Sequence, residues 1–253
     1  MQKLYTLLRE HTNAAQYEKV LDSLRTNILT AFYTPSFIPQ TLYKALEETG
    51  IQPKSLYEPS AGAGVFIDAG IKVFPALEMV RAVEKDLLTG RILGAVSRSY
   101  SVPVETLIAG LEYSSNTDNG TADLVVSNIP FGNFKVFDPL YIDKEKVLTD
   151  RIHNYFFAKG LDKLDDGGLM AYITTDTFLN SPGNRVAREY LFGQADFISL
   201  AVLPENLMSD TGGTDAPSHL LLVQKHSGKT VLSVEEQQLL ETVVQQMNMV
   251  AIR

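Results

Sequence analysis

The residues best placed to do chemistry are an amide and an aromatic ring, Asn128 and Phe131, in the stretch "SNIPFGNF" that follows a run of apolar residues. The Asn128 side-chain oxygen and the backbone carbonyl of Ile129 can each accept a hydrogen bond from an exocyclic amine. Pro130 biases Ile129 towards an extended conformation, and Phe131 offers a flat face on which a base can stack. Two acceptors and one aromatic face suit an extruded adenine, although a proline turn with a core Phe has the same pattern.

A second candidate is the glycine-rich stretch "YEPSAGAGVF". Gly62 and Gly64 allow a sharp turn and a close approach of the backbone to a ligand. Glu58 argues against a phosphate, because a carboxylate repels it, and it suits a cationic or amine-bearing ligand. Glu84 lies twenty residues after Gly64, where an acid can bind both hydroxyls of a ribose. Taken singly, these patterns are also typical of a ligand-free turn and of a solvated charge.

These residues need a scaffold, and the pattern of apolar runs predicts alternating strands and helices. Strands are predicted near residues 55–58, 79–83, 106–108, 122–128, 169–175, 197–204 and 218–225. Such alternation predicts an α/β fold with a mostly parallel sheet and helices on both faces. The last two strands lack an intervening helix, so we expect one antiparallel strand near the sheet edge. The candidate stretches fall at carboxyl ends of strands, where ligands of such sheets bind.

Composition narrows the class of protein. The chain has 253 residues, 45% of them hydrophobic, which is enough for one large domain. We predict a helical extension over residues 1–30, a catalytic domain over 31–230 and a C-terminal helix over 231–253. No apolar run approaches 18 residues and the start is too polar for a signal peptide, so a cytoplasmic protein is expected. The absence of cysteine and the four scattered histidines disfavour a metal site.

Together and in this order, "AFYTP", "EPSAGAGVF", Glu84 and "SNIPF" resemble the motifs of N6-adenine DNA methyltransferases that use S-adenosylmethionine. The resemblance is to the gamma-ordered subgroup, and within it to bacterial methylase domains joined to helicases. It spans roughly residues 25–226. It implies a Rossmann-like methyltransferase fold with a seven-stranded sheet, and transfer of a methyl group to adenine N6 without a metal.

The resemblance also implies a role for each matching residue. Asn128 and the carbonyls of Ile129 and Pro130 hold the target amine, and Phe131 stacks on the flipped base. The resemblance implies that the methionine end of the cofactor is bordered by Tyr33, Thr34 and Pro35, and that the methionine and its ammonium are lined by Glu58, Ala61, Gly62 and Gly64. It also implies that Glu84 binds the ribose and that Glu112 contacts the cofactor's adenine.

Two departures from the family pattern leave alternatives open. Ile129 stands where the family most often has proline, although the carbonyl required there is retained. The chain also lacks an evident region for reading DNA sequence, and its net charge of −8 lowers the expectation of tight independent binding to nucleic acid. Help from a recognition domain or partner subunit is therefore expected. The alternatives are a methyltransferase for another amine, in an RNA base or a protein glutamine, and a non-catalytic cofactor-binding module.

Overall fold

The structure is a computed structural model that describes residues 34–144, 146–204 and 217–241, together with positions 9, 10, 13, 14 and 17. The chain divides into two compact units, residues 1–114 with 204–216 and residues 115–203 with 217–253. Most of the predicted helical extension and Tyr33 lie outside the described residues. The predicted domain boundaries at residues 30 and 230 stay predictions.

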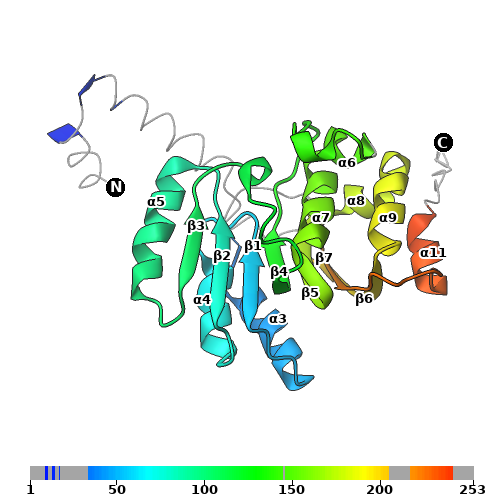
Figure 1. Ribbon diagram of the computed structural model, residues 1–253, viewed down its shortest axis with the longest axis horizontal. Helices are drawn as coiled ribbons and strands as arrows, with labels where there is room; N and C mark the ends of the chain where they lie inside the picture. Colours follow the sequence, from blue (N-terminus) through cyan, green and yellow to red (C-terminus); the bar gives the residue numbers. More distant parts are fainter. Residues whose placement is uncertain are drawn as a thin grey trace, which may run out of the picture. The chain divides into compact units, whose positions relative to one another are not determined.

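The first unit contains three parallel strands, β1 (Ser55–Glu58), β2 (Met79–Val83) and β3 (Val104–Leu107), in which β2 pairs with both β1 and β3 (Figure 1). Its helices are α3 (Phe37–Glu48), α4 (Val65–Val73) and α5 (Leu87–Val96), with short 3-10 turns η1 (Ser97–Ser99) and η2 (Leu111–Tyr113). Helix α3 packs against α4, α4 contacts β1, and α5 contacts β3.

Local sequence explains where these helices begin and end. On α3, Leu42, Tyr43 and Leu46 are buried at helical spacing, and Gly50 follows with a φ of +86°. Helix α5 begins after Asp86, whose carboxylate accepts a hydrogen bond from the Thr89 N–H at 2.7 Å. This cap fixes the backbone immediately after Glu84.

The second unit contains β4 (Ala122–Asn128), β5 (Leu164–Thr175), β6 (Ala195–Leu203) and β7 (Ser218–Lys225). Strands β4 and β5 are parallel, whereas β7 runs antiparallel to both β5 and β6. Its helical elements are η3 (Pro139–Tyr141), α6 (Val147–Asp150), α7 (Ile152–Lys163), α8 (Asp176–Asn180), η4 (Pro182–Asn184), α9 (Arg185–Phe192) and α11 (Val234–Leu240).

The strand order β3-β2-β1-β4-β5-β7-β6 makes one seven-stranded sheet. It is parallel except at β7, so the predicted fold class is confirmed. The third strand spans residues 104–107 rather than the predicted 106–108, because its alternation with solvent is weak and Pro103 marks its start poorly. No helix within the described ranges is long and apolar enough to cross a membrane.

Candidate active site

The glycine turn after β1 is held by its own backbone. The Ala61 N–H donates to the Val83 carbonyl at 2.8 Å, and the Gly64 N–H donates to the Ala61 carbonyl at 2.9 Å. Gly62 and Gly64 have φ angles of +54° and +89°, which side-chain-bearing residues adopt only at a cost. A Cβ on Gly64 would lie 2.8 Å from Leu93 Cδ1, whereas a Cβ on Gly62 would meet no described atom within 4 Å. Gly64 therefore allows the close approach of Leu93, whereas Gly62 borders open space.

Glu84 connects the glycine turn to the end of β2. One carboxylate oxygen accepts from the Gly62 N–H at 2.8 Å, and the other accepts from the Asp86 N–H at 2.7 Å. Burial raises the pKa of Glu84, while the hydrogen bonds from the backbone of Asp86 and Gly62 act in the opposite direction. Each oxygen keeps a further lone pair, so the carboxylate can also accept hydrogen bonds from two ribose hydroxyls.

Glu58, the last residue of β1, is only 1% exposed, and its Oε2 atom has no hydrogen-bond partner. Burial raises the pKa of Glu58 well above its usual value, and the nearby charge of Glu84 raises it further. A buried carboxyl group without a partner is costly. A cationic ligand would supply the missing partner, so the residues of this unit fit the ammonium or sulfonium of S-adenosylmethionine.

For the remaining predicted cofactor residues, the structure gives the burial and the position in the fold. Ala61 is buried within the turn, and Thr34 and Pro35 are half-buried just before α3, where the Ile38 N–H donates to the Pro35 carbonyl at 3.0 Å. Glu112 is half-buried in η2, beyond the end of β3. The assignment of these residues to the cofactor stays a prediction.

In the second unit, Asn128 is the last residue of β4. The Ile129 N–H donates to the Ile173 carbonyl at 3.1 Å, so hydrogen bonding to β5 continues one residue past the strand. The Ile129 side chain is 1% exposed, whereas Pro130 and Phe131 are half-buried. The departure at position 129 is thus explained: the side chain is buried, and the residue donates a hydrogen bond that proline cannot make.

The buried polar side chains on α7 were not predicted from the sequence. His153, Asn154, Lys159 and Lys163 are buried in this helix, and His153 bonds to Asn184 across 3.1 Å. The only sequence signal was the presence of polar residues in an otherwise apolar helix. In the described residues, no group of three or more His, Asp or Glu side chains is arranged to hold a metal ion.

The fold and the glycine turn define the class: the chain has the fold of S-adenosylmethionine-dependent methyltransferases. A Listeria monocytogenes protein described as a class I methyltransferase of this kind matches with a TM-score of 0.64 at 16% identity, over 79% of this chain and 63% of that chain. Residues 90–206 match the sequence model of the Eco57I restriction-modification methylase family. These matches bear out the predicted resemblance to S-adenosylmethionine-dependent methyltransferases, and they support S-adenosylmethionine as the cofactor.

Two further relatives are informative. The Defense against restriction protein B of Escherichia phage P1 is 28% identical over 201 residues, which are 78% of this chain and 8% of that protein. The methyltransferase subunit of a type I restriction-modification system from Streptococcus thermophilus matches with a TM-score of 0.64 at 17% identity, over 85% of this chain and 48% of that one. The chain thus spans a small part of the phage relative and about half of the subunit.

Proposed function

We propose that this chain is the catalytic domain of a DNA methyltransferase that transfers a methyl group from S-adenosylmethionine to adenine N6. The observation that carries the proposal is the sequence Asn-Ile-Pro-Phe at the end of β4, residues 128–131, within the region that matches the restriction-modification methylase family. A cytoplasmic location and DNA as the partner are part of this proposal.

The first unit would hold the cofactor, which supplies an electrophilic methyl group on a cationic sulfur. Glu58 balances positive charge, because its buried carboxyl group has an oxygen without a hydrogen-bond partner. Glu84 accepts hydrogen bonds from ribose hydroxyls while it remains bound to the Gly62 N–H. Gly62 allows the backbone to approach the ligand closely, since the space around its Cα is open.

The end of β4 would hold the target base. Asn128 Oδ1 and the Ile129 carbonyl accept the two N6 hydrogens, which disfavours delocalisation of the nitrogen lone pair into the ring. Phe131 stacks on the extruded base. The rate enhancement comes mainly from positioning of two bound groups and from acceptors aimed at the charge that develops on N6.

The test is formation of N6-methyladenine in duplex DNA by the purified chain, measured by mass spectrometry of digested nucleosides. Asn128→Ala should abolish transfer, while calorimetry shows unchanged binding of S-adenosylmethionine. Asn180→Ala, at an exposed position that ends α8, is the matched control and should behave as wild type.

Other outcomes separate the alternatives. Full activity of Asn128→Ala would contradict the mechanism. Methylation of RNA or protein but not of DNA would favour a different amine as the substrate. Cofactor binding without transfer to any substrate would favour a binding module.

A further inference from the structure

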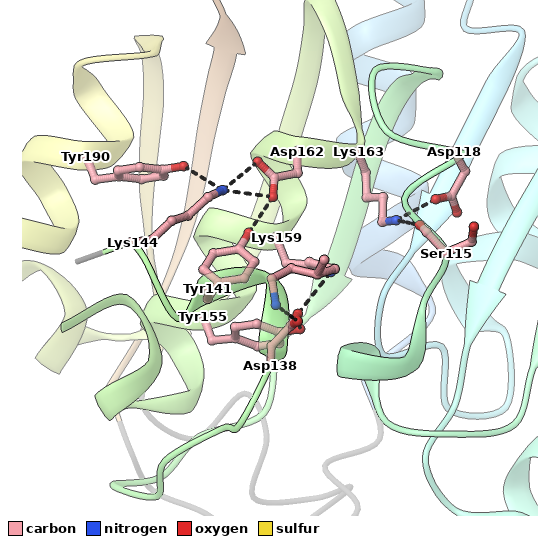
Figure 2. Close-up of polar contacts among 11 residues, drawn as sticks. Ser115, Asp118, Asp138, Tyr141, Lys144, Tyr155, Lys159, Asp162, Lys163 and Tyr190 are labelled. Carbon is pink, nitrogen blue, oxygen red and sulfur yellow. Dashed lines mark hydrogen bonds and ion pairs between the residues drawn. The ribbon is translucent and has the colours of Figure 1, made fainter. Parts of the chain in front are cut away.

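A polar face of α7 meets a polar face of residues 132–144, the segment that follows the Asn128–Phe131 motif. On the helix, Tyr155, Lys159 and Asp162 are spaced by four and three residues, so they lie on one side. In the segment, Asp138, Tyr141 and Lys144 are spaced by three. Figure 2 shows the six side chains pointing towards one another.

The first contact centres on the Asp138 carboxylate, which is buried. Asp138 Oδ2 accepts from the Tyr155 hydroxyl at 2.6 Å and from Lys159 Nζ at 3.0 Å, and Oδ1 accepts from the Leu140 N–H at 2.9 Å (Figure 2). Burial raises the pKa of Asp138, but the bonds from Tyr155, Leu140 and Lys159 outweigh it, and the pKa lies below its usual value. Asp138 is therefore a fully paired buried carboxylate.

The second contact lies one helical turn further along α7. Asp162 Oδ2 accepts from the Tyr141 hydroxyl at 2.6 Å and from Lys144 Nζ at 3.2 Å, and Lys144 also reaches the Tyr190 hydroxyl at 3.4 Å. Lys144 Nζ lies 4.2 Å from the centre of the Tyr141 ring, within the range of a cation–π interaction. The segment is thus attached to α7 at two successive points.

Three other residues of the segment are apolar and exposed. Phe134, Phe137 and Leu140 are 48%, 75% and 48% exposed. Burial of large side chains therefore contributes little to holding these residues in place. The backbone here is held by the polar contacts with α7, by the buried Tyr141 ring, which lies 5.4 Å from the Tyr155 ring, and by the bond from the Val136 N–H to the Thr149 carbonyl at 2.9 Å.

We propose that Lys159 is a positioning residue for the target-base motif, acting through Asp138. Asp138 lies seven residues after Phe131, and its ion pair with Lys159 is almost fully buried on both sides. Without Lys159, Asp138 is a buried charge lacking its cation, and the segment leaves α7 or takes up water. Phe131 and the carbonyls before it then lose their fixed orientation. This proposal rests on the proposed function.

The experiment compares Lys159→Met with Lys163→Met in the full chain. Lys163 lies on the same helix and is equally buried, but it bonds to Asp118 and the Ser115 carbonyl, which precede β4 (Figure 2). Hydrogen exchange of peptides covering residues 131–144 should accelerate at least tenfold in Lys159→Met and remain unchanged in Lys163→Met. The single-turnover rate of methyl transfer should fall at least tenfold in Lys159→Met only, with S-adenosylmethionine affinity unchanged.

A double variant, Asp138→Asn with Lys159→Met, covers the case in which the single variant fails to fold, because it leaves no unpaired buried charge. It should regain the wild-type melting temperature because no charge is left unpaired, but not the slow exchange or the transfer rate, because the bond between Lys159 and position 138 is still missing. Wild-type exchange in the Lys159 variants, equal losses in Lys163→Met, or fast exchange with full transfer would each overturn the proposal. If the wild-type chain methylates nothing, the proposed function fails, and the exchange data alone decide whether Lys159 fixes the segment.

Discussion

Glu58 illustrates at the residue scale how a ligand site can lower stability. Its folded-state pKa is raised by burial, so the folded protein holds a proton that the unfolded chain releases above a pKa of about 4.3. Stability is therefore lost as the pH rises from that value towards the folded-state pKa. Glutamine does not ionise, so Glu58→Gln avoids this loss. We predict that its free energy of unfolding exceeds that of wild type by about 1–2 kcal/mol at pH 7.5 and equals it near pH 3.5.

Thermal unfolding across this pH range, without cofactor, measures the difference. Glu47→Gln, at an exposed position on α3, is the control and should shift the melting temperature at neither pH. Glu58→Gln should also bind S-adenosylmethionine at least tenfold more weakly, as expected for loss of a hydrogen bond to a charged group. A variant that is less stable than wild type at pH 7.5 would contradict the sign of this prediction.

Ile129 gives a second prediction at this scale. Ile129→Pro restores the residue most frequent in the resembling family, yet it removes the N–H that donates to the Ile173 carbonyl at 3.1 Å and replaces a buried side chain. We expect a loss of about 2–4 kcal/mol in unfolding free energy, measured from urea midpoints. Ile129→Val keeps the N–H and should cost about 0.5–1.5 kcal/mol. Equal losses in the two variants would show that the hydrogen bond does not matter.

At the scale of elements, the two glycines of the turn after β1 are expected to have different roles: Gly64 allows close packing, and Gly62 allows a ligand to approach the backbone. Both glycines have positive φ, but only Gly64 has a neighbour in the path of a Cβ, Leu93. We predict that Gly64→Ala lowers the unfolding free energy by about 1–3 kcal/mol and Gly62→Ala by about 1 kcal/mol. For cofactor affinity we expect the opposite: Gly62→Ala should weaken the binding of S-adenosylmethionine more than Gly64→Ala does. Calorimetry at matched folded fractions measures this difference. A Gly62→Ala variant with wild-type affinity would show that the cofactor does not approach this residue.

The sequence predicted those elements whose signals are local. The buried strand 122–128, for example, follows from its apolar run, Leu124-Val125-Val126. The pairing of Glu84 with the glycine turn was not predictable, because the bond from the Gly62 N–H joins residues 22 apart. The Asp138–Lys159 ion pair was missed for the same reason, since nothing in either local sequence specifies the partner.

At the scale of the whole molecule, the net charge bears on how the proposed methyltransferase would bind DNA. The chain carries −8 and matches only 8% of the length of its phage relative and 48% of the Streptococcus thermophilus subunit. Non-specific affinity for DNA comes mainly from cations that neutralise phosphates. A chain with this charge balance can hold the reacting groups while another domain or subunit supplies most of the contacts to the DNA backbone.

The salt dependence of DNA binding tests this division. If the chain neutralises only one to three phosphates, the logarithm of its DNA association constant should fall against the logarithm of salt concentration with a slope no steeper than about −3. Fluorescence anisotropy with a labelled duplex, from low to physiological salt, measures the slope. Asn128→Ala should leave the slope unchanged, because the proposed function places that residue at the base and not at a phosphate. A slope near −8, as about nine phosphate contacts would give, would show that this acidic chain carries its own DNA-binding surface and needs no partner to hold the duplex.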